Sequence, residues 1–184
     1  MDTKLKYPPT LKVEGRDDVN LRLINIDDVP ELYDVMIHNR KHLERHLQTG
    51  DLTIKGVEDG VKWMLKHIDN GTYLQYRIIV GDKIIGSALL YDIDMEKGTA
   101  KTGIWVDKKS EGQGYASSAM KRLMDYGFEE LRLKKIVFDI DPSNEKSEKL
   151  AQRLGARLSK DEVLSETFDN GRKFTYRVWE AKRS

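Results

Sequence analysis

The sequence predicts a mixed α/β domain in which a twisted sheet of about seven strands is flanked by about four helices. Three observations support this fold class. Short segments of alternating apolar and polar residues are separated by glycine-containing turns, other segments repeat apolar residues at helical spacing, and a glycine-rich turn joins an apolar run to one of these helical segments. A chain of 184 residues suits one domain with its own core. We therefore expect a tail or short edge segment over residues 1–18 and a single domain over residues 19–184.

The first expected elements are a strand and a helix. Apolar and polar residues alternate over residues 19–23, which is typical of a strand. One of the aspartates at positions 27–28 then caps a helix that has Pro30 in its first turn. We expect this helix to break near Asn39. Its inner face is predicted to carry Leu32, Val35, Met36 and Leu43.

A second helix and three strands come next. Apolar residues recur at helical spacing over residues 54–68, and an asparagine–glycine pair ends the helix. Strands are predicted over residues 73–80 and 83–91, on either side of the tight turn Gly81-Asp82. A further strand is predicted over residues 99–106.

The last part of the chain alternates helices and strands. A helix is predicted over residues 117–131, and a strand over residues 134–140. The continuous apolar centre of this strand is typical of an interior position in a sheet. Another helix spans residues 145–154, and the last two strands flank the turn at residues 169–171.

Composition and charge exclude several classes of protein. The chain has 32 basic and 31 acidic residues, so its formal net charge of +1 does not favour sequence-independent binding of nucleic acid. Cysteine is absent, which removes disulfides, thiolate metal sites and a cysteine nucleophile. No run approaches the roughly 18 apolar residues that a membrane span requires. We therefore expect a cytoplasmic protein that binds neither membranes nor nucleic acid.

The most informative segment is the glycine-rich turn at residues 112–116, Gly-Gln-Gly-Tyr-Ala, between the apolar run 103–106 and the helix from Ser117. A glycine turn at the start of a helix leaves backbone N–H groups free at the positive end of the helix dipole, where they can bind phosphate oxygens. The alternative is that the two glycines only ease a tight turn between a strand and a helix. The turn alone leaves both interpretations open.

Two sequence blocks resemble the GNAT superfamily of N-acetyltransferases. The resemblance as a whole covers about residues 19–180. Residues 111–116 match the pyrophosphate signature Gln/Arg-x-x-Gly-x-Gly/Ala at the glycine and Gly/Ala positions, although Glu111 replaces the Gln or Arg. Residues 144–156 resemble the family helix Asn-x-x-Ser-x-x-Leu-x-x-x-Leu-Gly-Phe. A third block, residues 39–47, is similar to a segment of the RimJ/RimL branch, which acetylates protein N-termini, with His46 in place of the expected Trp.

This resemblance implies that acetyl-CoA is the co-substrate. We expect no metal. The backbone N–H near Val106 would stabilise the oxyanion, and Ser147 would donate a proton to the leaving sulfur, so these two form the expected catalytic set. Asn144 would hold the pantetheine arm. A carboxylate near a pyrophosphate is unfavourable because both are negatively charged, so Glu111 puts the affinity for acetyl-CoA in question. The implied cofactor-binding residues are Ile104, Trp105, Val106, Glu111, Gly112, Gln113, Gly114, Tyr115, Ala116, Ser117, Asn144 and Ser147.

The resemblance implies that the acceptor is a primary amine, and it favours the N-terminus of a protein or peptide. An α-amine needs less help from a general base than lysine, because its pKa is about 2.5 units lower. The base itself stays open, and Asp92, Asp94 and Glu96 are candidates for drawing in an ammonium group. Two alternatives remain: an acetyltransferase for a polyamine or aminoglycoside, and a GNAT-fold module that binds CoA without catalysis. We expect a monomer or homodimer.

The histidines at positions 38, 42 and 46 would share one face of an unbroken helix, and two of them could bind a metal. The break expected near Asn39 and the absence of a metalloprotease motif argue against that use. A role for His46 on the acceptor side is the preferred interpretation.

Overall fold

The computed structural model describes residues 7–45, 52–159, 163–167, 171 and 173–183. A nine-stranded sheet has the order β1-β2-β3-β4-β5-β6-β9-β7, and β8 pairs with β9. Every neighbouring pair is antiparallel except β5 and β6, which run parallel. The strands are β1 Thr10–Lys12, β2 Val19–Leu23, β3 Tyr73–Val80, β4 Lys83–Asp94, β5 Thr99–Val106, β6 Lys135–Ile140, β7 Arg157–Leu158, β8 Leu164–Thr167 and β9 Lys173–Lys182.

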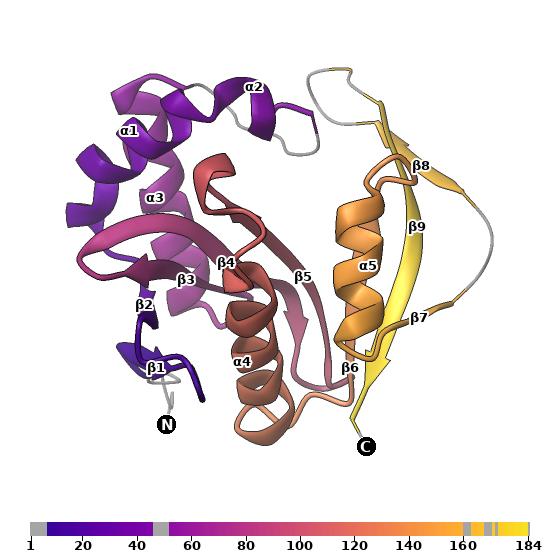
Figure 1. The fold of residues 1–184 in the computed structure, drawn as a ribbon. Helices are drawn as coiled ribbons and strands as arrows, with labels where there is room; N and C mark the ends of the chain where they lie inside the picture. Colours follow the sequence, from indigo (N-terminus) through magenta and orange to yellow (C-terminus); the bar gives the residue numbers. More distant parts are fainter. Residues whose placement is uncertain (1–6, 46–51, 160–162, 168–170, 172, 184) are drawn as a thin grey trace.

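Five α-helices and two short 3-10 helices accompany the sheet in the described part of the chain (Figure 1). The helices α4 and α5 cover one face, and α1 and α3 cover the other. The helices are α1 Val29–His38, α2 Arg40–Leu43, α3 Ile54–Asp69, α4 Tyr115–Glu129 and α5 Glu145–Arg153, with η1 Ile26–Asp28 and η2 Lys108–Ser110. None of the helices in the described residues has the length and apolar character of a membrane span.

The mixed α/β class predicted from the sequence is confirmed, with small differences in number and bounds. The seven expected strands are present, and two short ones are added: β1 lies inside the expected tail, and β7 has only two residues. The break at Asn39 is confirmed, because α1 ends at His38 and α2 begins at Arg40. The helix expected from Ser117 begins two residues earlier, at Tyr115, and ends at Glu129. Residues 169–170 of the last predicted turn lie outside the described residues.

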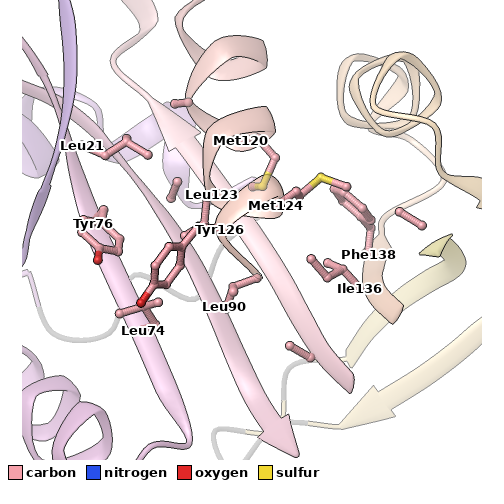
Figure 2. Close-up of a cluster of buried hydrophobic side chains, with 14 of the residues drawn as sticks. Leu21, Leu74, Tyr76, Leu90, Met120, Leu123, Met124, Tyr126, Ile136 and Phe138 are labelled. Atoms are coloured by element: carbon pink, nitrogen blue, oxygen red, sulfur yellow. The ribbon is translucent and has the colours of Figure 1, made fainter. Parts of the chain in front are cut away.

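The main core forms where α4 packs on the central strands (Figure 2). Figure 2 shows Leu123 and Tyr126 of α4 beside Leu74 and Tyr76 of β3, and all four side chains are buried. Because side chains alternate along a strand, the neighbouring Tyr73 points to the opposite face, where it packs with α1 and α3 in a second cluster. The sheet therefore has apolar cover on both faces.

A buried charge cluster connects the start of α1 to the sheet. Arg77 of β3 is only 1% exposed, and its Nε lies 3.6 Å from the Asp28 carboxylate. The other Asp28 oxygen pairs with Arg22 at 2.6 Å, and the Arg77 guanidinium donates to the Ser87 hydroxyl at 2.6 Å. Burial lowers the pKa of Arg77 to about 10, whereas the negative charge of Asp28 acts to raise it. Asp28 is thus the carboxylate that compensates a fully buried cation.

Removing that carboxylate should destabilise the fold. We expect Asp28→Ala to lower the free energy of unfolding by about 3–5 kcal/mol, because it leaves the Arg77 charge buried without its partner. Urea denaturation measures the change. The matched control is Asp59→Ala, which breaks an exposed pair with Lys55 on α3 and should have a much smaller effect. Equal losses in the two variants would contradict this account of the cluster.

Candidate active site

The separation of β5 from β6 opens a cleft in the sheet. The two strands are paired from Thr99–Lys135 to Thr102–Phe138, and beyond that point no pairing joins them. A cleft of about 2100 Å³ begins there, bounded by the end of β5, the turn before α4, the end of β6, α5 and the α1–α2 segment. It is lined by every residue that the sequence assigned to the cofactor except Gln113.

The backbone of β5 presents free hydrogen-bonding groups to this opening. The Asp107 N–H donates to the Ile85 carbonyl of β4 at 2.6 Å, and backbone groups alternate in direction along a strand. The N–H and C=O of Ile104 and Val106 therefore point away from β4, toward the gap that β6 leaves. Those of Trp105 point to β4, where its carbonyl occupies the space that a Cβ on Gly86 would need. Of the three expected positions, two have backbone groups at the opening.

The turn before α4 carries a row of unused backbone donors. Gly112 and Gly114 have φ angles of 76° and 81°, a conformation that glycine adopts without strain. Among the described residues, the six amides from Gly112 to Ser117 donate to no protein acceptor, and the first bond of α4 runs from Ser118 to the Gly114 carbonyl. These donors sit at the positive end of a helix of 15 residues. The arrangement has the geometry of an anion-binding site.

The start of α5 faces this turn across the cleft. Asn144 is the N-cap residue, and its Oδ1 accepts from the Ser147 N–H at 3.2 Å. The amide NH₂ of Asn144 is left to donate elsewhere. The half-buried Ser147 hydroxyl has no hydrogen-bond partner in the described structure, and both side chains line the cleft. The two residues expected to contact the pantetheine arm and the sulfur thus share one short segment of the cleft wall.

Glu111, the residue that departs from the family signature, is held on both oxygens. Its Oε2 lies 2.6 Å from Nζ of Lys146 on α5, and its Oε1 lies 3.2 Å from Nε2 of His42 on α2. The carboxylate expected to repel a pyrophosphate is therefore matched by a lysine. No local pattern signals this pairing, because Lys146 is 35 residues away and belongs to the facing wall.

Arg16 also reaches the turn, from the segment that was expected to be a tail. It donates to the Gln113 carbonyl at 3.1 Å, and its guanidinium lies 4.8 Å from the centroid of the Tyr115 ring. Asp18 pairs with it at 2.8 Å. The contacts span 97 residues of sequence, so no local pattern could have identified Arg16. It contacts the turn without being one of the residues that line the cleft.

The histidines considered for a metal are separated by their contacts. His38 Nδ1 is 2.6 Å from the Asp34 carbonyl, and His42 binds Glu111. His46 lies outside the described residues, as does its expected acceptor-side role. Within the described ranges no three metal-ligating side chains gather in one place. Asn39 instead connects this region to the cleft, because its Oδ1 accepts from the Lys108 N–H at 3.0 Å.

The acidic residues that line the cleft differ from those that the sequence suggested. Asp94 is engaged in a turn with Lys97 at 2.7 Å, and neither Asp92 nor Glu96 lines the cleft. Asp139, at the end of β6, does line it. The Asp139 carboxylate is 9% exposed and pairs with Lys101 at 3.0 Å, so its charge is already compensated.

Comparison with known proteins gives a consistent family. Residues 18–157 match the acetyltransferase (GNAT) domain. The ribosomal-protein-serine acetyltransferase of Escherichia coli (strain K12) is 24% identical over 168 residues, 88% of this chain and 92% of that protein. The spermidine N(1)-acetyltransferase of the same strain is 30% identical over 106 residues, 58% of this chain and 56% of that protein.

A solved structure shares the fold. RimL, a ribosomal α-N-protein acetyltransferase in complex with coenzyme A, superposes with a TM-score of 0.83 at 18% identity, covering 94% of this chain and 97% of RimL. The domain match spans most of the sequence and includes the turn, α5 and most of the residues that line the cleft. The chain belongs to the GNAT family of acetyltransferases.

Proposed function

We propose that this acetyltransferase transfers the acetyl group of acetyl-CoA to the α-amine of a protein or peptide N-terminus. The observation that carries the proposal is the row of six unused amides from Gly112 to Ser117 next to an unpaired strand edge. The amides suit the diphosphate of CoA, and the backbone groups of Ile104 and Val106 suit the amides of its pantetheine arm. Coenzyme A is bound in the RimL structure, which has the same fold.

The acetyl thioester supplies the group to be transferred, and the chain's residues position and stabilise the reaction. The amine attacks the thioester carbonyl carbon, and the Val106 N–H, which points into the opening, stabilises the oxyanion that forms. The attack forms the carbon–nitrogen bond, and collapse of the intermediate restores the carbonyl and breaks the carbon–sulfur bond. The Ser147 hydroxyl gives a proton to the departing sulfur, directly or through water. The proton lost by the amine goes to solvent through a water relay, and the general base stays open.

The preference for an α-amine rests on acidity and on the relatives. The pKa of an α-amine is about 2.5 units below that of lysine, which corresponds to about 3.4 kcal/mol of deprotonation cost. Asp139, an acidic residue that lines the cleft, is already paired with Lys101 at 3.0 Å, so no free carboxylate is assigned as the base. An acceptor that is partly neutral near pH 7 fits such a site. The E. coli relative aligned over 88% of this chain is a ribosomal-protein-serine acetyltransferase.

A small polyamine is the second candidate acceptor. The observation that favours it is the 30% identity to a spermidine N(1)-acetyltransferase, which covers 58% of this chain. Such an acceptor requires deprotonation of an amine with a pKa near that of lysine. The acceptor experiments below separate the two candidates.

Blocking the turn should abolish the cofactor site. Gly114→Val forces a β-branched residue into a φ of 81° and places its Cβ 3.3 Å from the Arg16 guanidinium. We expect CoA affinity, measured by calorimetry, to fall at least about tenfold. Gly155→Val is the matched control, because Gly155 has a φ of 82° at the far end of α5. An unchanged affinity in a folded Gly114→Val protein would place the diphosphate elsewhere.

Ser147→Ala should slow turnover while leaving acetyl-CoA affinity almost unchanged. General acid catalysis is typically worth about 10²- to 10⁴-fold, and a thiolate is already a good leaving group, so the effect should be at the low end or less. Steady-state kinetics with detection of the free thiol give both quantities. A loss confined to affinity would mean that Ser147 binds CoA and does not act as an acid.

The pH dependence reports the acceptor. Only the neutral amine is nucleophilic, so the rate with a peptide acceptor should rise with pH and level off near the α-amine pKa, at about pH 8. A lysine or polyamine acceptor without a dedicated base should keep accelerating to about pH 10. A profile with the peptide that does not level off below pH 9 would count against the α-amine.

The acceptor class is tested with a matched pair of peptides. A peptide with a free N-terminus should be acetylated, and its N-blocked twin that contains lysine should not. Spermidine serves as the third acceptor. Equal rates for the two peptides, or a higher kcat/KM for spermidine, would replace the α-amine with a side-chain or small amine.

A further inference from the structure

Glu111 creates an electrostatic problem at the proposed cofactor site. It directly precedes the amides of residues 112–117, which would receive the negative charge of a diphosphate. A carboxylate beside that anion opposes binding. Two contacts reduce this repulsion, because both Glu111 oxygens have cationic or ionisable partners from other elements.

Lys146 is the stronger of these partners. It comes from the first turn of α5, on the wall opposite the amide row, and its Nζ is 2.6 Å from Glu111 Oε2. Its side chain is 81% exposed, and an ammonium group has three donors, so the contact with Glu111 leaves two of them available. Both residues line the cleft. The ammonium group is therefore held at the edge of the amide row with capacity for a second anion.

Glu111 is itself fixed in place. His42 on α2 holds Oε1 at 3.2 Å while Lys146 holds Oε2. An unpaired lysine on a helix surface would sample many rotamers, and ordering it costs conformational entropy. A carboxylate anchored on one side and paired on the other restricts the ammonium group to the cleft. The contact thus orients the lysine before any ligand arrives.

We propose that Lys146 is a ligand of the CoA diphosphate and that Glu111 is the residue that positions it. The pair adds no net charge, but it places a donor with two free hydrogens next to six free amides, so the repulsion expected from Glu111 is replaced by a charge-assisted contact. This inference rests on the proposed function, because it concerns the same cofactor.

The test is a double-mutant cycle on CoA affinity, measured by calorimetry. Lys146→Met should weaken CoA binding about tenfold, the scale of one partly solvated charge-assisted hydrogen bond. Glu111→Gln should weaken it a few fold, because the lysine loses its anchor. In the Lys146→Met background the sign should reverse: Glu111→Gln should then strengthen binding, since only the unpaired carboxylate remains. Lys146→Arg should restore most of the loss.

Simple repulsion gives a different pattern. If Glu111 only repels the diphosphate, Glu111→Gln tightens CoA binding in both backgrounds, and the proposal is overturned. An unchanged affinity in Lys146→Met would also overturn it. Pantetheine, which lacks the diphosphate, should inhibit the wild type and Lys146→Met equally; a parallel loss for pantetheine would mean that Lys146 only shapes the cleft.

Controls separate this inference from the proposed function. Lys121→Met and Asp125→Asn remove an exposed pair of 2.7 Å on α4, away from the cleft, and should leave CoA affinity unchanged. Thermal unfolding confirms that each variant is folded. If the wild type does not bind CoA, the proposed function fails. If it binds and the cycle shows no reversal of sign, only the role of Lys146 and Glu111 fails.

Discussion

The separation of β5 from β6 after Thr102 and Phe138 is the constraint on which the rest of the site depends. These strands form the only parallel pair among the described strands, and α4 connects them across the sheet. A parallel connection of this kind brings the start of the crossover helix to the end of the first strand. The unpaired edge of β5 and the free amides before α4 therefore lie at the same end of the sheet. One topological feature thus gives the chain both a strand edge for an extended ligand and a helix terminus for an anion.

The walls of the cleft come from segments that contribute different chemistry. Backbone groups dominate on the β5 side, whereas side chains dominate on α5, where the capping arrangement leaves the Asn144 amide and the Ser147 hydroxyl available. Contacts from distant segments hold these walls together. Arg16 reaches the turn from the N-terminal segment, and Asn39 accepts from the Lys108 N–H just before it. Glu111, which differs from the family signature, is also paired with a residue of a distant segment, Lys146 on the facing helix.

The fold was largely predictable because its main elements carry strong local patterns. The tight turn Gly81-Asp82 after β3 and the helical spacing over α3 predicted bounds that agree with the structure to within one residue. The strands β1 and β7 were missed, since three and two residues are too short to show a period. The turn before α4 was recognised from its glycines, whose positive φ angles the structure bears out. The contacts of Arg16, His42 and Lys146 were not predictable, because each joins segments that no local pattern relates.

The central claim is that the amides of residues 112–117 bind the diphosphate of CoA, and amide NMR tests it most directly. In a titration of the ¹⁵N-labelled protein with CoA, the N–H resonances of these six residues should show the largest downfield shifts, because they gain charged acceptors and have no protein acceptor among the described residues. Pantetheine should perturb Ile104 and Val106 while leaving the six amides almost unchanged. Saturating CoA that shifts other resonances and leaves those of residues 112–117 in place would contradict the account.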